Sequence, residues 1–248
     1  MSNEHFDFKQ FSIKQDRCAM KVGTDGVLLG AFVHLPQQDK IRVLDIGTGT
    51  GLIALMQAQR LAEKGVDFQI DALEIDPEAA QQAAENFAES PWGNRIHIIP
   101  LSLQTYAQDQ EAEASYDLIV SNPPFYNATL KPEDEARATA RHKDALPLSE
   151  IAQYAQQHLS TQGTLHLIYP TSYDPEVLMA ATLATLHPIT LCDVVTKKGK
   201  PCKRRMATFA LSTHPTTDIE RQHLTIRNED NEYSEEYLRL VKAFYLFI

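Results

Sequence analysis

Short apolar segments alternate with longer amphipathic segments along most of the chain. Seven segments combine β-branched and other apolar residues with flanking turn residues, which is typical of buried strands. They cover residues 41–46, 68–74, 95–100, 116–121, 164–169, 189–195 and 206–212. Helical spacing of apolar residues predicts helices over 52–64, 77–90, 147–159 and 174–186. These repeated strand–helix units predict an α/β fold with a seven-stranded, mostly parallel sheet and helices on both faces.

The start of the chain differs from this alternating pattern. Residues 1–40 precede the first predicted strand, and we expect them to form an N-terminal extension to a single compact domain over 41–248. Within the extension, residues 27–34 predict a short apolar helix that Thr24 or Asp25 caps.

Composition narrows the function classes. The 248 residues are 43% hydrophobic and carry a net charge of −10, which disfavours broad, charge-driven binding of nucleic acid. The three cysteines form no CxxC pair and the nine histidines no HExxH motif, so we expect neither a disulfide framework nor a metal site. The chain has no signal-peptide pattern and no apolar run of membrane-spanning length. We therefore expect a cytoplasmic monomer without a membrane association.

Glycines alternate with threonines in a loop directly after the first predicted strand. The loop contains Gly47, Gly49 and Gly51, and Asp45 lies two positions before the first of these glycines. Alternating glycines let the backbone turn sharply and approach a ligand, and the amides at the start of the next helix face that ligand. A dinucleotide-binding loop needs another glycine at position 52, where this chain has Leu52.

An acidic residue ends the second predicted strand. Glu74 lies 23 residues after Gly51, close to the offset at which a carboxylate accepts ribose hydroxyls in this type of site. Taken alone, the glycine loop could be a tight turn and Glu74 a solvent-exposed carboxylate. Their order along the chain, with a strand and a helix between them, favours a cofactor site. The loop resembles the first motif of class I methyltransferases, which implies S-adenosylmethionine as the cofactor. The residues that we expect to bind it here are Asp45, Gly47, Gly49, Gly51 and Glu74.

The tetrapeptide Asn122-Pro123-Pro124-Phe125 follows the fourth predicted strand. Its prolines stiffen the loop and bias Asn122 toward an extended conformation. The side-chain carbonyl of Asn122 and the backbone carbonyl of Pro123 are then placed to accept both hydrogens of one amine, and Phe125 offers a ring for stacking. Catalysis by positioning needs neither a titrating base nor a metal. A proline-bent loop with Phe125 in the core is the alternative, and similar motifs serve adenine, guanine, cytosine and glutamine amides.

Nearly the whole chain resembles the bacterial tRNA (valine) adenosine-37 N6-methyltransferases. Beyond the two motifs, the similarity lies in residues 8–11, 16–31, 231–237 and 243–247. This resemblance implies a Rossmann-like class I methyltransferase fold and S-adenosylmethionine as the methyl donor. It also implies the N6 amine of adenosine 37 in a valine tRNA as the acceptor.

The same resemblance implies cofactor contacts outside the glycine loop. In the family, the segment before the first strand helps to close the cofactor pocket, which implies Lys21, Thr24 and Asp25 near the methionine end of the donor. A turn and a helix cap explain Lys21 and Asp25 equally well. A residue after the third strand flanks the adenine in the family, and here that position falls on Ser102 or Leu103.

Six basic residues stand between the last two predicted strands of this acidic chain. They are Lys197, Lys198, Lys200, Lys203, Arg204 and Arg205. Gly199 and Pro201 predict a turn among them, so we expect a positive hairpin tip that contacts tRNA phosphates. A solvated loop is the alternative. A second basic group, formed by Arg137, Arg141, His142 and Lys143, predicts a loop over the target base, although an acidic run next to it opposes this role.

Three other functions stay open at this point. A protein glutamine methyltransferase would use the same tetrapeptide but gain nothing from the basic hairpin. A ribosomal RNA guanine N2-methyltransferase often carries histidine where this chain has Tyr126. A cofactor-binding RNA chaperone or scaffold would keep the fold without turnover, which the intact Asn122 disfavours.

Overall fold

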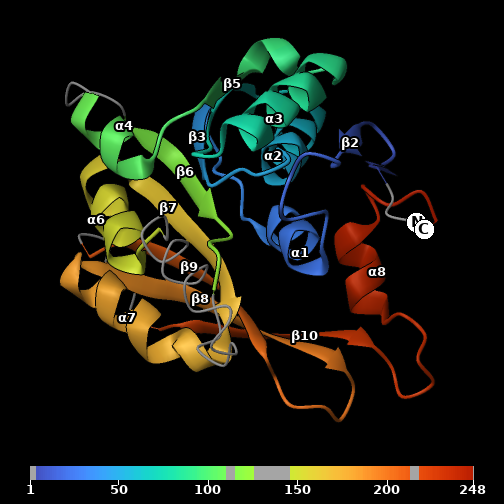
Figure 1. The fold of residues 1–248 in the computed structure, drawn as a ribbon. Helices are drawn as coiled ribbons and strands as arrows, with labels where there is room; N and C mark the ends of the chain where they lie inside the picture. The colour runs from blue at the N-terminus through green and yellow to red at the C-terminus, as the bar shows by residue number, and fades with distance from the viewer. Residues whose placement is uncertain (1–3, 110–114, 126–145, 213–217, 248) are drawn as a thin grey trace, which may run out of the picture.

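Eight strands form one sheet through the middle of the molecule (Figure 1). The computed structural model describes residues 4–109, 115–125, 146–212 and 218–247. The strands are β3 (Lys40–Ile46), β4 (Asp67–Leu73), β5 (Ile96–Ile99), β6 (Tyr116–Ser121), β7 (Leu159–Pro170), β8 (Leu186–Lys197), β9 (Arg204–Leu211) and β10 (Glu220–Arg227). Their order in space is β10-β8-β9-β7-β6-β3-β4-β5.

The sheet is parallel from β5 to β7, and only β9 runs against its neighbours β7 and β8. The predicted α/β class and the mostly parallel sheet are confirmed, but the sheet has one strand more than the expected seven. The additional strand is β10, which pairs in parallel with β8. The apolar pattern does not predict β10, because only residues 224–226 of this strand are buried and its other side chains are polar.

The central strands send alternate side chains into two cores. In β3, Ile41 and Val43 belong to one core, whereas Leu44 and Ile46 belong to the other. The first core lies under α1 (Thr24–Phe32), α2 (Leu52–Glu63) and α3 (Pro77–Glu89). The second lies under α4 (Leu103–Asp109), α6 (Leu148–His158) and α7 (Asp174–Leu183). Helices therefore cover both faces of the sheet, as the pattern predicts.

The two ends of the chain lie side by side (Figure 1). At the N-terminal end, β1 (His5–Asp7) and β2 (Ser12–Lys14) form a two-stranded sheet. At the other end, α8 (Glu235–Val241) packs against α1 and β10, and a bridge joins Phe8 to Tyr245. Short 3₁₀ turns, η1 (Gly93–Arg95) and η3 (Thr171–Tyr173), precede β5 and α7.

Helix α1 begins earlier than the sequence predicts. Its N-cap is Gly23, which offers no side-chain cap, and Thr24 and Asp25 lie inside its first turn rather than at its cap. The helix lies close to α2, because a Cβ at Gly30 would overlap Met56. This close packing lies near the end of α1, and the start at Thr24 differs from the start at residue 27 that the apolar pattern predicts.

The predicted cap of α3 is confirmed. The Oδ1 atom of Asp76 accepts from the amides of Glu78 and Ala79.

The second basic group at 137–143 lies outside the described residues. Within the described ranges, no helix has the length and apolar character needed to cross a membrane. Nor do the residues in those ranges contain a cluster of three or more His, Cys, Asp or Glu side chains suited to a metal ion.

Candidate cofactor and acceptor site

A cavity of about 1130 Å³ opens where β3, β4 and β6 end. It is therefore at the carboxyl edge of the parallel strands, where α/β sheets bind ligands. Its lining comes from residues 18–26, 46–50, 52–53, 73–76, 79, 101–104, 122–125, 146, 168–172 and 203–204. The glycine loop, the tetrapeptide and the end of the N-terminal extension therefore meet at one cavity.

The three glycines of the loop have left-handed backbones with different neighbours. Gly47, Gly49 and Gly51 have φ of +72°, +56° and +83°, a region that L side chains rarely adopt. A Cβ at Gly47 or Gly49 would meet no atom within 4 Å, so the loop presents bare backbone there. A Cβ at Gly51 would overlap the ring of Phe87 in α3. Gly51 does not line the cavity, and its role is to let the loop pack on α3.

Asp45 supports the loop from behind. It is fully buried and does not line the cavity, so the structure gives no support to the cofactor contact expected of Asp45. Its Oδ2 accepts from Oγ1 of Thr48 at 2.6 Å and from the amide of Ala54 at 3.1 Å. Its Oδ1 is buried with no partner among the described residues. Burial raises the pKa of Asp45 to about 7, because the desolvation penalty exceeds the opposing effect of these two hydrogen bonds.

Glu74 lies on the cavity side of the same loop. Its Oε2 accepts from the amide of Gly49 at 2.8 Å, and its Oε1 accepts from the amide of Asp76 at 3.0 Å. Each carboxylate oxygen keeps a further lone pair. The half-buried carboxylate thus lies at the end of β4 with acceptor capacity directed to the cavity lining, as a ribose contact requires.

The tetrapeptide is fixed to the strand that carries the glycine loop. Ser121 pairs with Ile46 in the parallel register of β6 and β3, and its Oγ donates to the Ile46 carbonyl at 2.8 Å. The next residues, Asn122 and Gly47, therefore leave the sheet side by side. Sequence reasoning missed Ser121, whose hydroxyl gives no signal without the strand pairing.

Within the tetrapeptide, Asn122 is half-buried, Pro123 is buried, and both line the cavity. Phe125 is half-buried as well, with its ring centroid 4.8 Å from that of Tyr173 and 6.4 Å from that of Tyr169. Phe125 packs against the second core and still lines the cavity. Phe125 is therefore partly in the core, and its stacking on a base stays a prediction.

The residues that the family resemblance added also reach the cavity. Lys21, Thr24, Asp25 and Leu103 all line it. Sequence reasoning missed further apolar contributors, which are Cys18, Met20 and Ile75. The side chains of Met20 and Ile75 are 56% and 51% exposed, which is unusual for large apolar residues and typical of a ligand-facing wall.

The basic hairpin separates into paired arginines and exposed lysines. Arg205 lies between two carboxylates, and its side chain is only 16% exposed. Its Nη1 is 2.5 Å from Oδ2 of Asp174, and its Nη2 is 2.7 Å from Oδ1 of Asp193. Arg204 donates from Nε to Oδ2 of Asp25 at 2.8 Å. The two carboxylates around Arg205 disfavour an RNA contact there, whereas the Arg204 side chain is 39% exposed beside the cavity. The RNA contacts expected of both arginines stay predictions.

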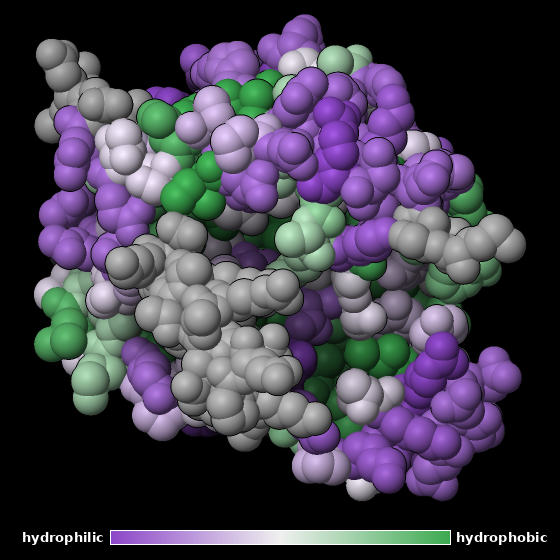
Figure 2. Space-filling view, viewed as in Figure 1, coloured by the Kyte–Doolittle hydropathy of each residue, from purple (hydrophilic) through white to green (hydrophobic). Residues whose placement is uncertain are grey.

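The lysines lie differently. Lys198, Lys200 and Lys203 are exposed, and Lys197 is half-buried at the end of β8. Figure 2 shows hydrophilic side chains gathered at the lower right, over the connection between β8 and β9. Lys198 pairs with exposed Glu229 at 3.1 Å, whereas Lys203 also lines the cavity.

Comparison with known proteins identifies the family. The family model described as "Methyltransferase small domain" matches residues 24–191. A Christiangramia forsetii protein named tRNA1(Val) (adenine(37)-N6)-methyltransferase is 45% identical, over 99% of each chain. The chain belongs to the tRNA1(Val) (adenine(37)-N6)-methyltransferase family. Proteins of that name from Flavobacterium johnsoniae and Aeromonas hydrophila are 45% and 41% identical, over 97% and 98% of this chain and 99% and 98% of theirs. The family predicted from the motifs and chain ends is confirmed.

Solved structures extend the match to the fold. A predicted O-methyltransferase from Agrobacterium tumefaciens superposes with a TM-score of 0.64 at 14% identity, over 89% of this chain and 96% of its own. A ribosomal protein L11 methylase from Lactobacillus delbrueckii superposes with a TM-score of 0.53 at 17% identity, over 80% and 83%. This member of the tRNA1(Val) (adenine(37)-N6)-methyltransferase family thus has the Rossmann-like class I methyltransferase fold.

Proposed function

We propose that this protein transfers a methyl group from S-adenosylmethionine to N6 of adenosine 37 in tRNA1(Val). The observation that carries the proposal is the pairing of Ser121 with Ile46, which brings the tetrapeptide and the glycine loop to one cavity. The names of the relatives support the choice of nucleotide and tRNA. The same names do not favour ribosomal RNA or a protein amide as the acceptor.

The cavity residues fit the donor. The bare backbone at Gly47 and Gly49 allows close approach of a ligand, and Glu74 presents acceptors for ribose hydroxyls. Leu103 is buried beside the cavity and offers an apolar surface for the adenine. When bound, S-adenosylmethionine supplies a methyl group on a positively charged sulfur that leaves as a neutral thioether.

The tetrapeptide fits a planar amine. Oδ1 of Asn122 and the carbonyl oxygen of Pro123 accept the two hydrogens of the adenine N6. This holds the amine with its lone pair toward the donor and favours a more tetrahedral nitrogen. Phe125 stacks on the base. Once the new N–C bond has formed, the nitrogen loses its extra proton to water. Positioning and electrostatics therefore carry the reaction.

The exposed lysines fit the phosphates of the tRNA. Lys203 lines the cavity, and Lys198 and Lys200 extend the positive surface away from it along the hairpin, together with half-buried Lys197. The remainder of the chain is acidic, which limits non-specific binding. A tRNA substrate implies action in the cytoplasm, and the monomeric state stays a prediction.

A labelling experiment tests this function. The purified protein is incubated with radiolabelled S-adenosylmethionine and, in separate reactions, with unmodified tRNA, ribosomal RNA and a release factor. We expect label in the tRNA alone. Label in the ribosomal RNA or only in the release factor would select one of the other acceptors, and donor binding without any transfer would indicate a scaffold.

A further inference from the structure

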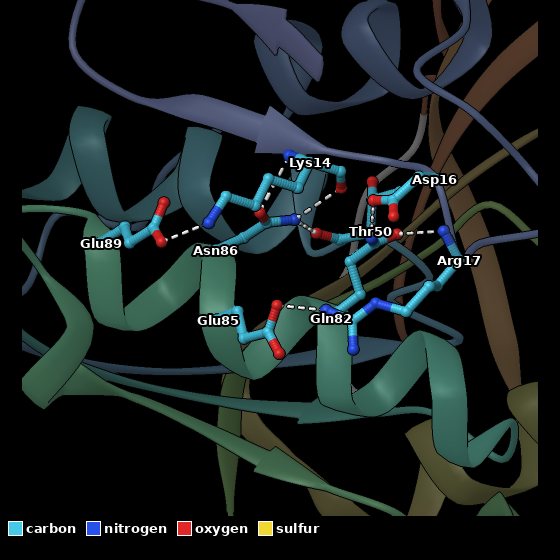
Figure 3. Close-up of polar contacts among 8 residues, drawn as sticks. All are labelled: Lys14, Asp16, Arg17, Thr50, Gln82, Glu85, Asn86 and Glu89. Atoms are coloured by element: carbon cyan, nitrogen blue, oxygen red, sulfur yellow. Dashed lines mark hydrogen bonds and ion pairs between the residues drawn. The ribbon is translucent and has the colours of Figure 1, made fainter. Parts of the chain in front are cut away.

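The N-terminal extension is attached to α3 by two buried carboxamides (Figure 3). Gln82 and Asn86 are 0% and 1% exposed and lie one turn apart on the face of α3 that meets residues 14–17. The residues that follow this contact, 18–26, line the cavity. Whatever fixes 14–17 therefore also places one wall of the site.

Asn86 contacts two other segments of the chain at once. Its Oδ1 accepts from the amide of Lys14 at 2.9 Å, and its Nδ2 donates to the Lys14 carbonyl at 3.0 Å. The same Nδ2 donates to the carbonyl of Thr50 at 2.9 Å. Thr50 lies in the glycine loop, so one side chain joins the end of β2, helix α3 and the loop.

Gln82 adds a second attachment point for the extension. Its Oε1 accepts from the amide of Arg17 at 3.2 Å, and its Nε2 donates to Oδ1 of Asp16 at 2.6 Å. The chain from 14 to 17 is thus held at both ends against one rigid helix. Because the same helix packs on Gly51 through Phe87, α3 sets the position of the loop and of the opposing wall together.

We propose that Asn86 is a positioning residue for the methyl donor. Through α3 it holds the glycine loop and the wall formed by 18–26 at the separation at which both contact the donor. Asn86 does not line the cavity, so it acts through these segments. The proposal rests on the proposed function only in taking S-adenosylmethionine as the ligand that both walls contact.

A merely structural role predicts a different result from a positioning role. If Asn86 only satisfied buried backbone groups, its loss would lower stability without a selective effect on the donor. The exposed ion pair between Lys14 and Glu89 offers a matched control, since it lies on the same helix and contacts neither the loop nor 16–26. Exposed pairs of this kind contribute little.

The test compares Asn86→Asp, Glu89→Gln and the natural protein. Asn86→Asp keeps the shape and removes the Nδ2 donor to the Thr50 and Lys14 carbonyls. We expect its dissociation constant for S-adenosylmethionine, measured by calorimetry, to rise about tenfold, as for loss of the buried hydrogen bond that reaches the glycine loop at Thr50. The kcat at saturating donor and the dissociation constant for tRNA stay within about twofold. Glu89→Gln leaves all three values unchanged.

An unchanged donor affinity in folded Asn86→Asp would overturn the proposal, as would an equal loss in Glu89→Gln. If Asn86→Asp does not fold, Asn86→Ser decides, because the shorter neutral side chain removes the contacts to Lys14 and Thr50 without placing a carboxyl group in the core. We expect about a tenfold loss of donor affinity there as well, and no loss would refute the proposal. Absence of transfer to tRNA by the natural protein would refute the proposed function but leave the donor-affinity comparison valid.

Discussion

The glycine loop and the basic hairpin are held in place by different kinds of interaction. The loop is fixed by buried groups, since the Asp45 carboxylate and the Asn86 carboxamide hold it from behind. The hairpin is held by ion pairs at the start of β9, in which Arg204 contacts Asp25 of α1 and Arg205 contacts Asp174 of α7 and Asp193 of the adjacent strand β8. The loop is thus held by buried hydrogen bonds, whereas some charges of the hairpin form ion pairs and others are exposed.

This difference separates the roles of the two regions. Under the proposed function, the loop and the adjoining tetrapeptide serve the chemistry, and the sheet sets their backbone positions. The hairpin serves tRNA affinity, and Lys200 and Lys203 are the exposed lysines that we expect to contribute most. We therefore expect changes at the strand ends to act on turnover and stability, and changes at the hairpin lysines to act on tRNA affinity and its salt dependence.

The largest effect is expected from Asn122→Ala. Removal of one of the two acceptors leaves the amine unoriented, so we expect kcat to fall by about 10² to 10³, as for the loss of one preorganised catalytic hydrogen bond. Donor affinity, measured by calorimetry, stays unchanged. Near-normal turnover would show that the tetrapeptide does not position the acceptor, and the contrast with the hairpin would fail.

The next largest effect is expected from Gly51→Ala, and a second glycine separates backbone strain from overlap with a neighbouring side chain. Gly51→Ala combines a left-handed backbone with overlap on Phe87, and we expect it to lower the free energy of unfolding by about 2–4 kcal/mol. Gly65→Ala is the control, since Gly65 has φ of +68° and open space around it, and about 1–2 kcal/mol is expected. Urea unfolding measures both. Equal losses would show that the loop does not depend on its packing against α3.

A smaller effect is expected from the pH dependence of Asp45. Its folded pKa of about 7 exceeds the unfolded value near ~3.9, so between these values the folded state binds a proton that the unfolded state lacks. This contribution to stability falls as pH rises toward 7 and is lost above it. Between pH 6 and pH 8, the natural protein should lose about 1.4 kcal/mol relative to Asp45→Asn in urea unfolding. Parallel profiles would show that the carboxyl is ionised throughout.

The smallest effect is expected at the hairpin. Replacing Lys200 and Lys203 by alanine should weaken tRNA binding about threefold and lower the slope of log K against log salt by about 0.7–0.9 for each lysine that contacts a phosphate. Arg205→Ala should lower the melting temperature and leave the slope unchanged, because its charge is already paired. If Arg205→Ala changed this slope more than the two lysine substitutions do, Arg205 and not the lysines would contact the tRNA. Filter binding over a series of salt concentrations measures the slope.

Local patterns predicted much of the fold and of the site. The strand at 116–121 and the Asp76 cap agree with the structure because an apolar run and a capping side chain act over a few residues. The meeting of the glycine loop and the tetrapeptide follows from parallel strand order. Predictions that depended on distant contacts fared worse. The partner of Arg204 is 179 residues away, and no local pattern indicates it.

Strand β10, the start of α1 and the contacts of Asn86 were not predicted, because the residues involved are polar or small. Strand β10 carries mostly polar side chains and is recognisable only beside β8. Helix α1 begins before its apolar run, and its glycines Gly26 and Gly30 gave no sign of their close contact with α2. Asn86 looks like an ordinary polar residue of α3 until the fold brings Lys14 and Thr50 to it. The nucleotide itself came from family resemblance, because a tetrapeptide that binds planar amines does not specify which amine.

The most direct measurement is the position and the atom that the protein methylates. An unmodified tRNA1(Val) transcript is incubated with the protein and S-adenosylmethionine, digested, and analysed by mass spectrometry, beside a transcript in which adenosine 37 is replaced by guanosine. We expect N6-methyladenosine at position 37 of the first transcript and no methylation of the second. A methyl group on any other nucleotide or atom, or equal labelling of both transcripts, would contradict the account.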